Sequence, residues 1–403
     1  MNNFILFDDK RWRTLLPLTF TRPVAELRIG IDTIREKWEA VLKTSCSYLC
    51  ETYLSVKYSS TYTANDFYIY GGVIPDENIL AAILQLKSGE QLIKDGALIA
   101  LRSSENYFSG AALSEHGKSF STINYNAELT IISNLWHIFQ FNDKVLRDDF
   151  KRLTANRQSQ QLSSTNTLIG DQIFVEQGVK LEACIINSQT GPIYISKNVE
   201  VMEGSMLRGP LFIGEHSVIK MGAKIYGGTT IGPHCRVGGE VSNVVFIGYS
   251  NKGHDGFLGN SVIGEWCNIG ADSNNSNLKN NYAEVKLWDY FEQKFIPTGL
   301  QFCGLIMGDH SKCGINTMFN TGTVLGVSAN VFGDGFPRNF IPSYSWGGAK
   351  GFVTYKLKDA LEVAKEVMKR RSIELNATEI NILTTIYELS EKYRKGQLIF
   401  LHR

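Results

Sequence analysis

Residues 195–237 read ISKNVE-VMEGSM-LRGPLF-IGEHSV-IKMGAK-IYGGTT-IGPHCR-V, with an aliphatic residue at every sixth position. Neither the period of about 3.6 residues of an α-helix nor the period of about 2 of a half-buried strand produces this spacing. A coil with three short flat sides does, because each aliphatic side chain then points inward onto its equivalent in the next coil. The spacing therefore predicts a parallel β-helix built from hexapeptide repeats.

The six-residue spacing extends over 165–345, apart from an interruption at 272–302. At about eighteen residues per coil, this length makes about eight to ten coils. The interruption begins rich in Asn and continues with Trp288, Tyr290 and Phe291, which are costly to leave in water. A long insertion on a rigid scaffold is typical of functional segments. We expect the three aromatic residues to contact a neighbouring subunit.

Residues 1–128 alternate short apolar runs with a helical pattern, which predicts an α/β domain. Strands are expected at 4–7, 67–70 and 97–101. A helix is expected at 78–94, where apolar residues recur at helical spacing.

The remaining segments predict helices. Residues 131–153 predict one amphipathic helix, within a helical arm and linker at 129–164. After the β-helix, the tail from 346 to 403 predicts a helical cap with helices at 357–371 and 377–394. We expect this cap to cover the open end of the β-helix.

The bulk composition indicates a cytoplasmic enzyme. The 403 residues carry 41 Lys and Arg against 40 Asp and Glu, so no basic surface predicts nucleic acid or a membrane as partner. No apolar run approaches about 18 residues, and the N-terminus lacks the basic region of a signal peptide. The seven Cys are scattered, which favours reduced thiols and gives no metal-binding spacing.

The stretch 252–271 holds the strongest candidate for chemistry. Transfer of an acyl group from a thioester to an amine needs a base that accepts the proton of the attacking amine. His254 suits this role, because an imidazole titrates close to neutral pH and Gly-rich sequence surrounds it. His216, His234 and His310 also lie in the repeat, and we expect their side chains to be solvated.

This stretch resembles the acetyltransferase domain of the GlmU family, whose members join a glucosamine-1-phosphate N-acetyltransferase to a uridyltransferase. The matching residues are Lys252, His254, Phe257-Leu258-Gly259-Asn260, Asn268-Ile269-Gly270-Ala271-Asp272 and Asn277-Leu278. The run Gly308–Thr317 is similar to a later coil of the same family. The resemblance covers about 165–345 and implies a left-handed β-helix, a homotrimer and acetyl-CoA as co-substrate.

The resemblance also implies roles for single residues. His254 becomes the general base. The residues facing the sugar are Lys252, Phe257, Asn268 and Asn277. The residues along coenzyme A are Ala271, Ile315 and Ala329.

Departures from the family pattern leave open which sugar accepts the acetyl group. The family's Tyr is Phe257, and two motifs with basic residues that grip the sugar phosphate are replaced by 226–229 (Tyr-Gly-Gly-Thr) and 242–245 (Ser-Asn-Val-Val). We therefore expect an amino sugar phosphate or a nucleotide sugar as acceptor, without choosing between them.

The N-terminal region resembles the sugar-phosphate nucleotidyltransferases of the same family. Leu16-Pro17-Leu18-Thr19 matches their motif, but the segment 8–13 lacks every Gly of their phosphate-binding loop. The metal-binding Asp they carry is missing from 70–73 (Tyr-Gly-Gly-Val). The candidates for nucleotide phosphates are Arg13 and Arg22. We expect a degenerate domain, weak or inactive in nucleotidyl transfer, with Mg²⁺ needed only if it is active.

Three functions remain in competition. The leading one is an acetyl-CoA-dependent N-acetyltransferase. The second is a sugar-1-phosphate nucleotidyltransferase or a bifunctional enzyme. The third is a non-catalytic trimeric scaffold, which a sealed groove around His254 would favour.

Overall fold

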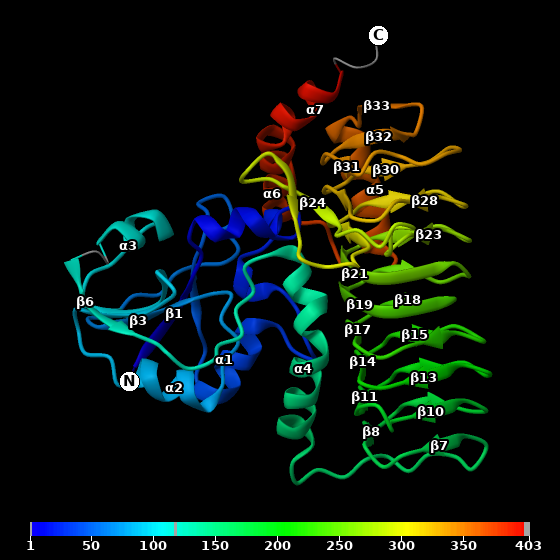
Figure 1. The fold of residues 1–403 in the computed structure, drawn as a ribbon, viewed down its shortest axis with the longest axis horizontal. Helices are drawn as coiled ribbons and strands as arrows, with labels where there is room; N and C mark the ends of the chain where they lie inside the picture. Colours follow the sequence, from blue (N-terminus) through cyan, green and yellow to red (C-terminus); the bar gives the residue numbers. More distant parts are fainter. Residues whose placement is uncertain (1, 117–118, 399–403) are drawn as a thin grey trace. The chain divides into compact units, whose positions relative to one another are not determined.

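The computed structural model describes residues 2–116 and 119–398, which form two compact units. The first unit holds most of the chain up to Asn134. The second holds everything from Leu135 onward, together with the short segments Leu16–Leu18 and Arg28–Ile31. The predicted combination of an N-terminal α/β region, a parallel β-helix and C-terminal helices is confirmed (Figure 1).

The first unit is built on a six-stranded sheet of order β2-β1-β3-β5-β4-β6. Its strands are β1 (Asn3–Phe7), β2 (Ser47–Leu49), β3 (Asp66–Tyr70), β4 (Glu90–Lys94), β5 (Ala97–Ser103) and β6 (Ser121–Asn124). Its helices are α1 (Ile34–Leu42), α2 (Glu77–Leu84) and α3 (Gly110–His116), with 3₁₀ turns η1 (Lys10–Leu15), η2 (Leu18–Phe20) and η3 (Val24–Glu26) nearby in sequence. Strand β1 runs parallel to both of its neighbours, β2 and β3.

The prediction of a single helix over 78–94 is wrong. The helix α2 ends at Leu84, and β4 begins at Glu90 and pairs with β5 as an antiparallel hairpin. Gly89, with φ of +82°, lies in the turn between them, and such a backbone conformation does not continue a helix. The apolar residues of β4 fit either periodicity in so short a run.

The β-helix of the second unit has three parallel faces, and Figure 1 shows its strands stacked coil on coil. Face 1 contains β7 (Thr167–Ile169), β10 (Ile185–Asn187), β13 (Met206–Arg208), β16 (Lys224–Ile225) and the first halves of β19 (Glu240–Gly248) and β21 (Phe257–Glu265). Face 2 contains β8 (Ile173–Val175), β11 (Ile193–Ile195), β14 (Leu211–Ile213), β17 (Thr229–Ile231), the second halves of β19 and β21, β26 (Leu305–Met307), β29 (Thr323–Leu325) and β31 (Phe340–Ile341). Face 3 contains β9 (Lys180–Leu181), β12 (Glu200–Val201), β15 (Val218–Ile219), β18 (Arg236–Val237), β20 (Asn251–Lys252), β22 (Asn268–Ile269), β27 (Lys312–Cys313), β30 (Asn330–Val331) and β32 (Ser345–Gly348), followed by β33 (Gly351–Thr354).

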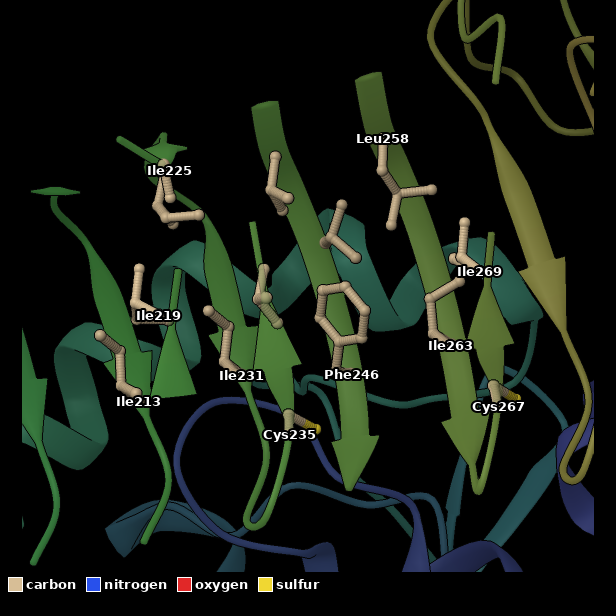
Figure 2. Close-up of a cluster of buried hydrophobic side chains, with 14 of the residues drawn as sticks. Ile213, Ile219, Ile225, Ile231, Cys235, Phe246, Leu258, Ile263, Cys267 and Ile269 are labelled. Carbon is tan, nitrogen blue, oxygen red and sulfur yellow. The ribbon is translucent and has the colours of Figure 1, made fainter. Parts of the chain in front are cut away.

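The aliphatic residues of the repeat fill the interior of this β-helix. Ile213, Ile219, Ile225 and Ile231 are each at most 1% exposed, and Figure 2 shows them among the inward side chains of neighbouring coils. Burying one such side chain contributes about 1.5–3 kcal/mol. The core is therefore one continuous column of apolar contacts along the coils.

Helix α4 (Leu135–Thr154) packs on the outside of face 2 rather than forming a free arm. Phe174, Tyr194 and Phe212 point outward from successive strands of that face and form a buried cluster with Leu146 of α4. Within α4, the Asn142 side chain donates to Gly228 O at 2.8 Å and accepts from Gly30 N at 2.7 Å. Face 2 is thus covered within the chain.

The C-terminal helices are α5 (Leu357–Lys369), α6 (Ala377–Leu389) and α7 (Glu391–Leu398). The predicted helix at 377–394 is divided at Ser390, between α6 and α7. Helix α6 reaches the last coils, where Tyr344 Oη donates to Leu383 O at 2.7 Å. The end of α5 instead lies along the side of the β-helix, since Arg371 donates to His234 O and to Asn251 Oδ1, each at 3.2 Å.

The interruption of the repeat contains three strands: β23 (Asn274–Asn275), β24 (Lys286–Asp289) and β25 (Lys294–Pro297). Strand β23 pairs with β28 (Met318–Phe319) of a later coil, and β24 and β25 form an antiparallel hairpin. The hairpin belongs to the second unit, where Figure 1 shows β24 beside the later coils.

Candidate active site

The turn that carries His254 follows a change in coil length. On face 3, Val201 pairs with Ile219 and Ile219 with Val237, which is the predicted coil length. Val237 then pairs with Lys252, three residues sooner. The shortened coil places a lysine at the inward position that Val237 and Ile219 occupy in the coils before it.

Lys252 is consequently a core residue. The resemblance had implied instead that it faces the substrate. Its side chain is 1% exposed, and its ammonium donates to Gly238 O at 3.1 Å and to His254 O at 2.8 Å. Burial lowers the pKa of Lys252 to about 8. Lys252 therefore holds the backbone of the His254 turn from inside the β-helix.

The His254 side chain is exposed and lies in a groove of ≈ 680 Å³ on face 3. Asn268, Ala271 and Ile315, all predicted site residues, line the same groove. Ile315 is 70% exposed, although it is an aliphatic residue. The structure thus brings together the predicted base, one predicted sugar contact and two predicted coenzyme A contacts.

The same groove is lined by five basic side chains. They are Lys220, Arg236, Lys312, Arg370 and Arg371. Burial lowers the pKa of Lys312 to about 8, so it is still mainly protonated at neutral pH. In the sequence, the Arg370-Arg371 pair at the end of the predicted helix 357–371 was the one signal of a basic site. The pair lines the groove because the end of α5 lies along the side of the β-helix.

The remaining predicted residues do not line this groove. Phe257 and Asn277 lie close to each other beside Gly259, and the Asn277 amide donates to Asn260 Oδ1 at 2.8 Å. Ala329 is 1% exposed and belongs to the core of the β-helix, so its side chain does not reach the groove, and its contact with coenzyme A stays a prediction. Ala329 is buried because it occupies an inward-pointing position of the hexapeptide repeat.

A ladder of stacked rings runs along one corner of the β-helix beside the groove. It comprises His216, His234, Tyr249, Trp266 and His310, with ring centroids of successive members 4.4 to 6.3 Å apart. Each of the five has a positive φ between 53° and 61°. The expectation that the three histidines are solvated is wrong for His310, which is 9% exposed. Tyr249 and Trp266 also line the groove.

In the first unit, the predicted nucleotide site lies after strand β1. Asp8 follows β1, at the edge where ligands bind to parallel sheets of this kind. Its carboxylate is 5% exposed and accepts from Val24 N at 3.1 and 3.3 Å, and burial raises its pKa well above its ordinary value. The turn η1 stands where the family has its Gly-rich loop.

The two predicted phosphate-binding residues of this unit differ in their exposure. Arg13 is exposed, with its guanidinium 5.6 Å from the Trp12 ring centroid. Arg22 is only 4% exposed, and its binding of nucleotide phosphates stays a prediction. Among the described residues, no group of three His, Cys, Asp or Glu could hold a metal ion.

Comparison with known proteins relates the N-terminal part of the chain to sugar nucleotidyl transferases. Residues 4–158 match the family model described as "Sugar nucleotidyl transferase". A "Bifunctional sugar-1-phosphate nucleotidylyltransferase/acetyltransferase" from Sulfurisphaera tokodaii is 32% identical over 93 residues, which cover 23% of this chain and 23% of that protein.

A solved structure was also matched. The crystal structure of UDP-N-acetylglucosamine acyltransferase matches 58% of this chain and 82% of its own, at 12% identity and a TM-score of 0.22. A TM-score this low carries no argument about the fold. The register of the paired strands defines the fold instead. No helix in 2–116 or 119–398 is long and apolar enough to span a bilayer. The sequence resemblance to the GlmU-like family is confirmed, with residues 4–158 matching its sugar nucleotidyl transferase part.

Proposed function

We propose that this protein is an acetyl-CoA-dependent N-acetyltransferase that acts on an amino sugar phosphate or a nucleotide sugar. The observation that carries the proposal is the groove on face 3, where an exposed imidazole, an exposed Ile315 and five cationic side chains converge. The name of the Sulfurisphaera tokodaii relative includes acetyl transfer, which agrees with this reaction class.

In this reaction His254 accepts a proton from the amine as the nitrogen attacks the thioester carbon. A C–N bond forms, the C–S bond then breaks, and the proton passes to the departing thiolate, so that an amide and a thiol result. General base catalysis of this kind is worth about 10²–10⁴-fold in rate. Lys252 contributes by fixing the His254 carbonyl, and hence the turn that presents the imidazole.

The cationic lining suits the phosphates of acetyl-CoA. Arg236 and Arg370 are exposed, and Arg371 is held in place by its bonds to His234 O and Asn251 Oδ1. Positive side chains around a groove attract and orient phosphate groups. Ile315 offers an apolar contact for the pantetheine chain.

The proposed assembly is a homotrimer. Face 2 is covered by α4, so subunit contacts are left to the other faces. On face 1 the outward side chains include Ile185 and Met206, which are 43% and 42% exposed. Two neighbouring exposed apolar side chains favour contact with a second copy around a closed ring.

The test is release of free thiol from acetyl-CoA with a panel of amino sugar phosphates and nucleotide sugars. His254→Ala should lower kcat by about 10²–10⁴-fold and leave the affinity for acetyl-CoA nearly unchanged. His216→Ala, an exposed histidine of the same β-helix, is the matched control. Full activity of His254→Ala would remove His254 from the mechanism.

A second candidate activity is nucleotidyl transfer by the first unit, which would make the protein bifunctional. The family match over 4–158 favours it, whereas the buried Asp8 and Arg22 and the absent Gly-rich loop favour a weak or inactive domain. We propose the weak or inactive form. Release of pyrophosphate from UTP and a sugar 1-phosphate at ordinary enzymatic rates, in the presence of Mg²⁺, would contradict it.

The proposal of a non-catalytic scaffold has less support. It requires the surroundings of His254 to be sealed, whereas His254 opens onto the groove on face 3 and onto a second hollow of ≈ 680 Å³ that includes Met221 and Asp255.

A further inference from the structure

The second unit holds another cavity, of ≈ 870 Å³, which shares no lining residue with the His254 groove. Its walls come from the β24–β25 hairpin, the coil that ends in β31, and α7. Four cationic side chains line it: Lys279, Lys286, Arg338 and Lys392. None of the described residues that line it is acidic.

Aromatic packing within the chain fixes the hairpin wall of this cavity. The Trp288 ring stacks on Phe340 with centroids 4.2 Å apart and meets Phe295 edge-on at 5.4 Å. Tyr290 packs edge-on against Tyr393 of α7 at 5.0 Å. The expectation that Trp288 and Tyr290 pack on a neighbouring subunit is therefore wrong, because they serve as the hairpin's own anchor.

One aromatic ring of the wall remains available to a ligand, because Phe295 is 41% exposed. The indole N–H of Trp288 has no hydrogen-bond acceptor among the described residues, but it is buried and does not open onto the cavity.

We propose that this cavity binds a nucleoside diphosphate. A base can stack on the exposed Phe295 ring, and such stacking contributes about 1–3 kcal/mol per base. The two phosphates carry the negative charge that the cationic lining, Lys279, Lys286, Arg338 and Lys392, complements. The volume lies within the range of about 300–1,000 Å³ typical of small-molecule sites.

The test uses the full chain, with UDP, ADP, uridine and inorganic pyrophosphate as calorimetric probes and a photoactivated azido-ADP to locate the site. UDP or ADP should bind more tightly than either uridine or pyrophosphate, and the label should attach to the hairpin at 286–297. The double variant Lys286→Glu/Lys392→Glu should weaken nucleotide binding at the labelled site by about tenfold or more, because two attractive contacts become repulsive.

Matched controls come from the same two elements. Lys294→Glu changes the hairpin and Lys395→Glu changes α7, and neither lysine lines the cavity. Binding in these controls should stay within about twofold of the wild type. Equal loss in the controls, no labelling of the hairpin, or pyrophosphate binding as tightly as UDP would each overturn the proposal. Because no lining residue is shared, these outcomes do not depend on His254.

Discussion

Replacing Lys252 by Met tests whether a charged group truly occupies the core of the β-helix. The pKa of Lys252 falls from 10.5 to about 8 because of burial, and each pKa unit corresponds to about 1.4 kcal/mol. Between pH 8 and 10.5 the unfolded chain binds one more proton than the folded chain. The contribution of Lys252 to the free energy of unfolding therefore rises by about 3 kcal/mol across that window, and the cost of the buried charge is present in full below pH 8.

At pH 7 alone, the free energy of unfolding of Lys252→Met does not test the placement, because two effects of the substitution oppose each other. Removing the buried charge relieves about 3 kcal/mol, but it leaves Gly238 O and His254 O without their donor, at about 1–3 kcal/mol each. The informative quantity is the free energy of unfolding of the wild type minus that of Lys252→Met, because other titrating groups cancel in this difference.

The assay is urea unfolding from about pH 7 to about pH 10.5 for both proteins. We expect the difference to rise with pH by about 3 kcal/mol, and the exposed Lys224→Met control to show no such rise. A difference that stays flat for Lys252→Met would mean that water reaches its ammonium, and the inward placement would be refuted.

Four other outcomes are expected. Asn268→Ala, which removes an exposed amide from the groove, should raise KM for the amino sugar more than it lowers kcat, as initial rates at varied acceptor concentration will show. Arg370→Ala should raise KM for acetyl-CoA by about threefold to tenfold, and the effect should shrink in high salt because the side chain is exposed. Ile219→Ala should cost about 2–5 kcal/mol in the free energy of unfolding, since the side chain is fully buried between coils; a loss below about 1 kcal/mol in urea unfolding would contradict continuous packing there. Met206→Glu should shift a trimer toward monomers in light scattering, and a wild type that is already monomeric at micromolar concentration would contradict the proposed assembly.

The β-helix was predictable because its periodicity is dictated by packing. Each coil must place an aliphatic side chain over the one before, so the spacing of Ile213 and Ile231 along the chain is enough to indicate the path of the backbone. The exposure of the His254 side chain was predictable because Gly253 and Gly256 mark a break in the repeat at this turn.

Other features were hidden because they depend on contacts between distant segments. Nothing in the sequence around Lys252 shows that the coil there is three residues shorter and turns the lysine inward. Likewise, Trp288 finds Phe340 and Tyr290 finds Tyr393 only once the hairpin has folded back on the later coils. The pairing of Arg371 with His234 O depends on the path of α5 in the same way.

A stack of coils is a one-dimensional cooperative system, in which each layer is stabilised by the layer on either side. The coil with Lys252 interrupts the apolar column at one layer, where an ammonium and two carbonyl groups replace a methyl-rich contact. Contact between the coils on either side therefore depends, at that layer, on the two hydrogen bonds of Lys252 as well as on apolar packing. The stability of the turn that presents His254 is thus coupled to the protonation of one lysine in the core.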